Sequence, residues 1–423
     1  MRLNSSFRER VKFKGCSSLP QNVTVYTVPN IQKVEDEHRR ACDQARLTED
    51  YRNHDTNSNA ALPRSRRGNG HLQGQLIGAE DHSGSSNYKD EVNGNKVDAP
   101  SGPQYQVRNV LLYYLFLVSA GLGQEVFYIS FLPCIHWNLD PFLCRRLINM
   151  WTVVMYIGQV LKDMLKMPRP LSPPVVKLET RVNAEYGMPS THAMAATAIF
   201  FTFLFSATHR FQFQFESGLL LAVVLSALVC LSRLYTGMHS ALDVIGGALI
   251  SVLLMLLTYP AWDAFDRLQL TSPLSPVVSV VLPFLLSYSY PELDHYSTTR
   301  GDTTTILGVG AGCSAGYWVN EQLGETFEPQ GDFPIPLPPL TWGALLLGGT
   351  RSLMGVALLL GTRHVVKSAS LWALCSWHQA CASDARTRRR REIEVPYKFT
   401  TYTVVGLVNT VLLNKAFRLL GLL

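Results

Sequence analysis

The stretch Ser232-Arg-Leu-Tyr-Thr-Gly-Met-His-Ser-Ala-Leu-Asp243 lies between two apolar runs, residues 218–231 and 241–260. The two runs predict a pair of membrane-spanning helices, so we expect the stretch at or near one end of that pair. His239 and Asp243 are four residues apart, a spacing that would place both side chains on one face of a helix. Asp243 could then accept a hydrogen bond from one ring nitrogen of His239, which would leave the other nitrogen free as a nucleophile.

Arg233, in the same stretch, carries a planar set of donors that suits phosphate oxygens. A histidine, a carboxylate that can orient it and an anion-binding arginine therefore fall within one short segment of a membrane protein. Short motifs also match by chance, so an equal alternative for this stretch alone is a set of three interfacial polar residues that satisfy one another.

Composition divides the chain into a polar beginning and an apolar remainder. It has 423 residues, a formal net charge of +6 and 47% hydrophobic residues. Residues 1–105 contain no apolar run long enough for a core and predict a disordered tail. Residues 106–260 form a predicted transmembrane core that carries the motifs, and residues 261–423 add further transmembrane helices. The positive charge gives no argument for nucleic acid, because much of it lies in the tail and in the arginine run 386–391.

Ten apolar runs predict an all-α, polytopic membrane protein with 8–10 transmembrane helices, eight of the runs being clear or fair and two doubtful. No internal repeat supports an inverted-repeat transporter. The first run contains Glu125, which is either functional or placed at the interface end of a tilted helix. The runs are residues 110–133, 147–165, 190–207, 218–231, 241–260, 276–290, 304–319, 342–361, 365–382 and 399–423.

Lys162 and Arg169 flank the end of the second run, and Pro170 restricts Arg169 to an extended backbone. Both cations could hold a phosphate. For this pair alone, ordinary juxtamembrane positive charge is the more common explanation.

Ser190, Thr191 and His192 open the third run. Ser190 and Thr191 can cap the helix, whose N-terminus offers free amide groups and a positive dipole end to an anion. His192 lies in the first turn and can donate a proton to a leaving group, whereas the alternative is a capped helix with an interfacial histidine.

The order of the three clusters along the chain predicts that they lie on the same side of the membrane. They read Lys-x6-Arg-Pro, Pro-Ser-Thr-His and Ser-Arg-x5-His-x3-Asp, each at the end of a predicted span. The Lys-x6-Arg-Pro cluster lies at the end of the second predicted span, and the Pro-Ser-Thr-His cluster lies at the start of the third predicted span. The fourth span then returns to that side with the third cluster, so we expect all three to converge at one membrane face.

This ordered set resembles the motifs of the type 2 phosphatidic acid phosphatases, the lipid phosphatase superfamily, and the resemblance covers residues 105–423. Thr191 stands where most members carry glycine, and a β-branched residue narrows the space beside the backbone there. Within the superfamily, three further runs resemble the sphingosine-1-phosphate phosphatases, in which the Ser-Thr pair is usual. These runs are residues 172–179, 185–195 and 299–303.

Two other runs, residues 123–129 and 394–399, resemble the second isoform of that family more than the first. The family resemblance implies a helical lipid-phosphatase core and a phosphoric monoester hydrolase that uses no metal and no cofactor. The implied substrates are sphingosine 1-phosphate and dihydrosphingosine 1-phosphate, and the implied location is the endoplasmic reticulum membrane.

The resemblance also implies roles for the motif residues. His239 would attack phosphorus and form a phosphohistidine, and Asp243 would orient it. His192 would protonate the departing alkoxide and later activate water. The phosphate would be held by Lys162, Arg169, Ser190, Thr191 and Arg233.

Two other functions fit parts of the pattern. A broader lipid phosphate phosphatase stays open, because pocket width cannot be read from a sequence. A multispan transporter or anion-binding protein would use the same cations for a permeating anion, but it predicts repeats or broken helices. A non-catalytic member of the fold would be expected to lack one of the residues His239, His192 and Asp243, all of which are present.

The distribution of positively charged residues predicts which connections lie on which side of the membrane. The arginine run 386–391 is the strongest cytosolic signal under the positive-inside rule. With residues 365–382 counted as a separate span, tracing back from this run places His239 in the lumen and Arg145 and Arg146 in the cytosol. If residues 365–382 lay only on the surface, the run would share the face of His239. Two acceptor sequences for lumenal N-glycosylation lie in the tail, at Asn4 and Asn22.

Overall fold

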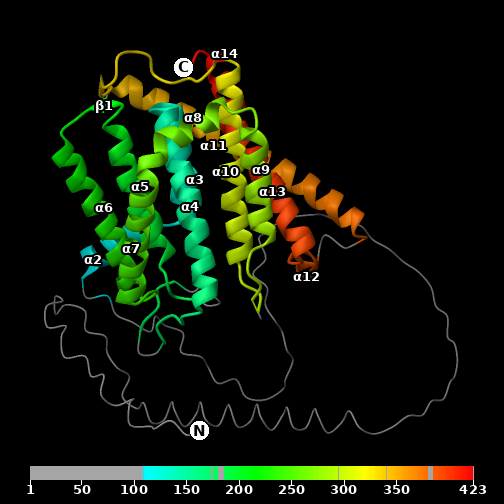
Figure 1. Cartoon of the computed structure of the whole chain (residues 1–423). Helices are drawn as coiled ribbons and strands as arrows, with labels where there is room; N and C mark the ends of the chain where they lie inside the picture. The colour runs from blue at the N-terminus through cyan, green and yellow to red at the C-terminus, as the bar shows by residue number, and fades with distance from the viewer. Residues whose placement is uncertain are drawn as a thin grey trace, which may run out of the picture. The chain divides into compact units, whose positions relative to one another are not determined.

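The computed structural model of the chain describes residues 107, 109–172, 175–179, 185–293, 295–339, 341–379 and 384–422 (Figure 1). The predicted tail, residues 1–105, and its acceptors Asn4 and Asn22 lie outside the described residues. Val107–Leu423 forms one unit of the chain.

Nearly all regular structure in this unit is helical, which confirms the predicted all-α class. Two short strands, β1 (Phe211–Gln212) and β2 (Ile335–Pro336), pair in parallel. The α-helices are α2 (Val110–Gly121), α3 (Glu125–Asn138), α4 (Pro141–Leu165), α5 (Thr191–Ala207), α6 (Phe215–Tyr235), α7 (Ala241–Thr258), α8 (Trp262–Thr271), α9 (Ser275–Tyr288), α10 (Thr299–Gln322), α11 (Trp342–Trp377), α12 (Ala385–Arg388), α13 (Arg391–Leu407) and α14 (Leu413–Leu419).

Among the described residues, three helical segments are long and apolar enough to cross a membrane: Phe215–Tyr235, Ala241–Thr271 and Trp342–Trp377. Large apolar side chains on them stay exposed, such as Leu220 on α6 and Leu256 on α7. Contiguous apolar surface of this kind is stable against lipid and unfavourable in water. These segments fit the predicted membrane protein, while the total of 8–10 spans stays a prediction.

Helix α4 packs against α3, α5 and α10 and carries the first motif at its C-terminal end. Asp140 caps its N-terminus by accepting a hydrogen bond from the Phe142 N–H (2.8 Å). Leu147 of α4 packs with Ile199 of α5 in the largest described apolar cluster. The helix ends where Lys166 takes a left-handed conformation (φ 50°).

The first predicted span, residues 110–133, is in fact two helices. Helix α2 ends at Gly121 and α3 begins at Glu125, of whose side chain the structure gives no description. Phe116 of α2 stacks on Tyr235 at the C-terminal end of α6, with ring centroids 4.8 Å apart. Hydropathy averages over the break, which is why the sequence predicts one span where the backbone turns.

The predicted span 342–361 and residues 365–377 of the next predicted span lie in one continuous helix, α11, which ends at Trp377. The prediction of a separate span at residues 365–382 is therefore wrong. Hydropathy predicts a loop for the polar residues between the two runs, but these residues are helical. One of them, Arg363, donates a hydrogen bond through Nε to the Tyr402 hydroxyl of α13 (3.0 Å). A side-chain partner on a neighbouring helix thus stabilises polar residues that hydropathy assigns to a connection.

This correction changes the predicted position of the arginine run 386–391 relative to the motifs. Arg389 and Arg391 line a cavity of about 360 Å³ together with Asp163 and Thr299. Asp163 is next to Lys162 in the last turns of α4, so the run lies at the same end of the bundle as the first motif. The charge argument that placed this run on the opposite face from His239 loses its basis.

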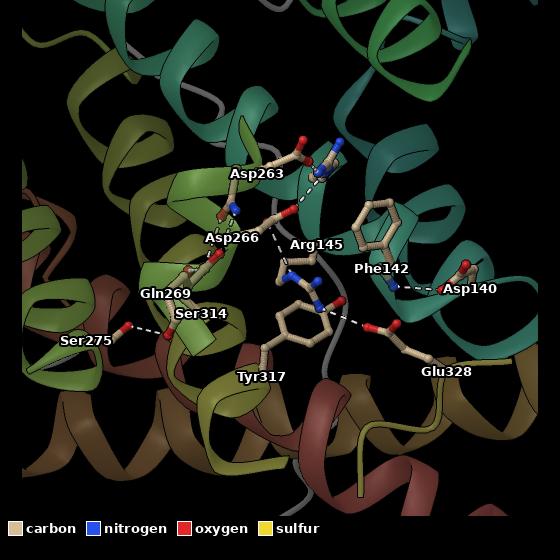
Figure 2. A network of polar contacts seen from close by, with 12 residues as sticks. Asp140, Phe142, Arg145, Asp263, Asp266, Gln269, Ser275, Ser314, Tyr317 and Glu328 are labelled. Atoms are coloured by element: carbon tan, nitrogen blue, oxygen red, sulfur yellow. Dashed lines mark hydrogen bonds and ion pairs between the residues drawn. The ribbon is translucent and has the colours of Figure 1, made fainter. Parts of the chain in front are cut away.

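The other end of α4 is held by buried ion pairs (Figure 2). Arg145 lies between Asp266 of α8 (Nε–Oδ1 3.3 Å) and Glu328 (Nη1–Oε1 3.2 Å), beside the ring of Tyr317. Arg146 also donates to Asp266 (Nε–Oδ2 2.6 Å). The two arginines therefore attach α8 to the start of α4, and we call this end of the bundle the arginine end.

Four helix ends meet at the opposite end, which we call the motif end: the C-termini of α4 and α6 and the N-termini of α5 and α7. Helix α5 packs against α4, α6 and α7, and Figure 1 shows α6 running from β1 toward this end. All three sequence motifs lie at these helix ends, as the alternation of predicted spans indicates.

Candidate active site

Lys162 lies in the last turn of α4, with only 1% of the residue exposed. Its Nζ lies 3.3 Å from Glu185 Oε2 and 3.3 Å from Thr191 Oγ1. The threonine at the position of the usual glycine thus supplies an acceptor that orients the lysine. Its methyl group faces Gly158 of α4, where an added Cβ would lie 3.3 Å from Thr191 Cγ2, so glycine leaves the room that the branched side chain needs.

Arg169 connects the first motif to the third. Its Nη1 donates to the Met238 carbonyl oxygen (3.2 Å), and its Nε donates to the Glu185 carbonyl oxygen (3.0 Å). Its Nη2 lies 3.3 Å from Glu185 Oε2, so this one carboxylate contacts two cations. Backbone acceptors on both sides hold the guanidinium in place.

Ser190 is the N-cap residue of α5, but the prediction that its side chain caps the helix is wrong. Its N–H donates to the Asp243 carbonyl oxygen (3.0 Å), which joins the second motif to the third. Its Oγ is buried and has no hydrogen-bond partner within the described residues. An unpaired buried hydroxyl is unfavourable, so this oxygen is available to a ligand.

His192 lies in the first turn of α5 and faces the break between α2 and α3. A Cβ added at Gly123 would lie 2.9 Å from His192 Cδ2 and 3.1 Å from Val229 Cγ1. The imidazole therefore fits only because residue 123 has no side chain.

Arg233 lies in the last turn of α6 and is fully buried. Its Nη1 and Nη2 donate to the two carboxylate oxygens of Glu179, at 2.9 Å and 3.3 Å. Its Nε is buried and finds no hydrogen-bond partner in the part of the chain that the structure describes. One donor of the guanidinium is therefore still free to bind an anion.

His239 lies in the turn before α7 and not on the helix that its spacing from Asp243 predicts. Gly237 permits this turn, since its φ is 69° and an added Cβ would collide with the Val176 carbonyl oxygen. Asp243 forms a capping box with Ser240, whose N–H donates to Asp243 Oδ2 (2.7 Å). The same Oδ2 lies 3.7 Å from His239 Nδ1, longer than a hydrogen bond but close enough for charge to favour one ring orientation.

Burial lowers the pKa of His239 from 6.5 to about 4. Asp243 opposes this shift in the pKa, whereas the positive charges of Arg169, Lys162 and Arg233 add to it. The imidazole is therefore neutral near pH 7 and keeps a lone pair on one nitrogen, which is the form that can act as a nucleophile.

Three buried cations from separate segments thus act on His239 through their charge. Two carboxylates from the connection between α4 and α5 bond to these cations. Anionic oxygens evidently fit between these donors, so a phosphate could use the same contacts. The cations are Lys162, Arg169 and Arg233, and the carboxylates are Glu179 and Glu185.

The structure brings all of the predicted site residues to the motif end and adds several that sequence reasoning misses. The pattern Ser240-x-x-Asp243 is a readable capping box, so Ser240 could have been found. Glu179, Glu185 and Gly123 fall in the runs 172–179, 185–195 and 123–129 that resemble the family, but the resemblance gives them no role. The two glutamates lie in a Pro-containing connection without periodicity, and Gly123 lies inside an apolar run, so no local pattern assigns them a role either.

Among the described residues, no group of three or more His, Cys, Asp and Glu side chains could hold a metal ion. The expectation of a metal-free site stays a prediction.

Comparisons with known proteins agree with the motifs. The PAP2 superfamily model matches residues 144–267, which include every predicted site residue. The chain is 57% identical over 321 residues to human Sphingosine-1-phosphate phosphatase 2, covering 75% of this chain and 80% of that relative. It is 41% identical over 333 residues to mouse Sphingosine-1-phosphate phosphatase 1, covering 78% of this chain and 77% of that relative.

A Schizosaccharomyces pombe dihydrosphingosine 1-phosphate phosphatase is 30% identical over 220 residues, which cover 50% of this chain and 53% of that relative. No solved structure matches the chain. The identities confirm the resemblance that the motifs indicate, and the second isoform is more similar than the first. The chain belongs to the sphingosine-1-phosphate phosphatase family of the PAP2 superfamily.

Proposed function

We propose that this protein hydrolyses long-chain base phosphates, namely sphingosine 1-phosphate and dihydrosphingosine 1-phosphate, to the free base and inorganic phosphate. The names of the relatives, sphingosine-1-phosphate phosphatase and dihydrosphingosine 1-phosphate phosphatase, support this substrate class. The observation that carries the proposal is the convergence of three buried cations, Lys162, Arg169 and Arg233, on the neutral imidazole of His239.

In the first step, His239 attacks phosphorus through Nε2, the ring nitrogen that does not face Asp243. A nitrogen–phosphorus bond forms while the bond from phosphorus to the ester oxygen breaks, which gives a phosphohistidine. His192 donates a proton to the departing alkoxide, so the long-chain base leaves as an alcohol.

In the second step, His192 takes a proton from water, and the water oxygen attacks the phosphohistidine. The nitrogen–phosphorus bond breaks, inorganic phosphate is released and His239 returns to its neutral form. Asp243 keeps the imidazole oriented and stabilises the positive charge that the ring carries during the transfer.

Fixed positive charge supplies the remaining stabilisation. Phosphoryl transfer depends mainly on positioning and on electrostatic stabilisation of the oxygens around phosphorus. Donors that are already in place need no rearrangement during the reaction, so this mechanism uses neither a metal nor a cofactor. The proposed phosphate-binding residues are Lys162, Arg169, Ser190, Thr191 and Arg233.

We also propose that the protein is a multipass enzyme of the endoplasmic reticulum membrane with its motif end in the lumen. Since the arginine run lies at the motif end, this assignment rests on Arg145 and Arg146 at the arginine end, which the positive-inside rule places in the cytosol.

A substrate panel with purified protein tests the function. Sphingosine 1-phosphate should be hydrolysed with a higher kcat/KM than phosphatidic acid. Equal values would indicate a broader lipid phosphate phosphatase. If none of these lipids releases phosphate, a transporter or another anion-binding protein would explain the cations better.

Trapping of radiolabelled phosphate tests the covalent step. Wild-type protein should carry label, and His239→Ala should carry none, whereas equal labelling would contradict the nucleophile assignment. Turnover should survive a strong chelator and should be inhibited by vanadate, which mimics the five-coordinate phosphorus. If turnover were lost in chelator and restored by added magnesium, the metal-free mechanism would be contradicted.

A further inference from the structure

The geometry points to a role for Glu185 in substrate choice: its carboxylate binds the ammonium group of the long-chain base and thereby selects lipid phosphates that carry an amine. This inference rests on the proposed function, because it concerns the substrate of the same site.

Glu185 is held through both carboxylate oxygens. Its Oε2 lies 3.3 Å from Lys162 Nζ and 3.3 Å from Arg169 Nη2. Its Oε1 accepts a hydrogen bond from Thr298 Oγ1 (3.1 Å), the N-cap residue of α10. Its side chain is 12% exposed. The carboxylate is therefore fixed beside two of the three phosphate-binding cations by a helix that carries none of the motifs.

A substrate phosphate that binds Lys162 and Arg169 takes the donors that Glu185 now uses. A phosphate carries more negative charge than one carboxylate and presents several oxygens to these cations, so it competes well for them. Oε2 of Glu185 would then be a largely buried, charged oxygen without a donor, which is strongly unfavourable. Because Thr298 holds the other oxygen, the side chain resists turning to solvent. When a phosphate is bound, a new cation beside Glu185 Oε2 would therefore stabilise the complex.

A long-chain base phosphate brings that cation with it. Its amine is protonated at neutral pH and sits on the carbon next to the one that carries the phosphate ester. The ammonium therefore enters beside the phosphate and can donate to Glu185 Oε2. A phosphate lipid without an amine leaves this oxygen unpaired, and a site with an unpaired buried polar group discriminates against such a ligand.

Glu179 provides a matched control within the same connection. It bonds to Arg233 through both oxygens, so it also loses donors when a phosphate binds. Its side chain is 21% exposed, compared with 12% for Glu185. Water can therefore solvate Glu179 more readily, and its contribution should not depend on an amine in the substrate.

The experiment compares kcat/KM of the full-length protein for sphingosine 1-phosphate and for hexadecyl phosphate, which keeps a long chain and a phosphate but lacks the amine. Glu185→Gln should lower the ratio of the two values at least about tenfold, mainly through the amine-bearing substrate. Glu179→Gln should leave the ratio unchanged. Thr298→Val, which removes the anchor, should lower the ratio in the same direction but by less.

An unchanged ratio in Glu185→Gln, or an equal loss with both substrates, would overturn the inference and indicate a structural ion pair. If the glutamine variant does not fold, Thr298→Val decides in its place, and an unchanged ratio in that variant overturns the inference. A wild-type protein that hydrolyses hexadecyl phosphate but no long-chain base phosphate would refute the proposed function itself. A wild type that prefers the base phosphate, with a ratio insensitive to Glu185, would refute only the role of Glu185.

Discussion

Asp243 uses one oxygen for two contacts with different consequences. Its Oδ2 accepts from the Ser240 N–H at 2.7 Å and lies 3.7 Å from His239 Nδ1. An asparagine can keep the first contact through its amide oxygen, but it has no charge to stabilise an imidazole that becomes positive during attack. One substitution can therefore separate helix capping from catalysis.

Asp243→Asn should keep the fold and lower kcat/KM by about 10²- to 10⁴-fold. Burial lowers the pKa of His239 to about 4, and removal of a carboxylate that raises this pKa lowers it further. The imidazole is then neutral in both proteins from about pH 5 to pH 8, so the loss should have the same size throughout that range. A loss that shrinks toward acid pH would mean that the wild-type imidazole becomes protonated within this range and the mutant imidazole does not, so that Asp243 controls the charge of His239, in contradiction to an orienting role.

Gly123→Ala should lower turnover by about tenfold or more, because the new methyl group would displace the His192 ring, and small displacements of a reacting group are costly. Gly121→Ala is the control, since an added Cβ there meets nothing within 4 Å. Turnover and folded yield of both variants are measured side by side. Equal activity of the two variants would mean that the position of His192 is less exacting than proposed.

Sequence spacing predicts which motif residues meet, since the order of spans decides the side of the membrane on which each motif emerges. The spacing does not predict which atoms of these motif residues contact one another. His239 and Asp243 do not share a helix, and the Ser190 hydroxyl leaves its helix uncapped. Glu179 and Glu185 reach the cations through a connection whose path depends on tertiary contacts, which local sequence does not encode.

Helix α10 shows why hydropathy finds buried helices poorly. Hydropathy predicts only a short apolar run at residues 304–319, but the helix covers Thr299–Gln322 and most of its residues are buried. It packs on α13 and α9, so its small residues are selected for close approach to protein and not for contact with lipid. By contrast, α6 and α7 expose leucines along their length and give clear apolar runs.

Gly312→Ala should destabilise the protein by about 1–3 kcal/mol, because an added Cβ would collide with the Thr403 carbonyl oxygen of α13, and a backbone atom cannot rotate away. Gly349→Ala in α11 is the control, because its Cβ meets nothing within 4 Å and alanine favours the helix. Thermal unfolding of both variants in detergent measures the difference. Similar unfolding temperatures would show that α10 and α13 can separate without cost.

For the whole molecule, charge gives conflicting signals about the membrane side. Arg145 and Arg146 lie at the arginine end, whereas Arg389 and Arg391 lie at the motif end. The positive-inside rule cannot assign both groups to the cytosol. Arg391 is paired with Glu292 (2.7 Å), so part of the run serves a tertiary contact and is neutralised there. Arg145 and Arg146 are paired as well, with Asp266 and Glu328, so pairing does not separate the two groups, and the proposal that follows Arg145 and Arg146 needs a direct test.

Glycosylation acceptors in short inserted loops test the resulting topology. An acceptor placed within residues 291–297, at the motif end, should be modified, because that end is proposed to face the lumen. An acceptor within residues 208–214 should stay unmodified, since Arg210 in that connection bonds to Asp140 and Glu328 at the arginine end. Sensitivity to an endoglycosidase in microsomes gives the measurement. The reverse pattern would place catalysis at the cytosolic face while leaving the chemistry intact. Modification of both loops would contradict the membrane crossing that α5 and α6 are expected to make between the two ends.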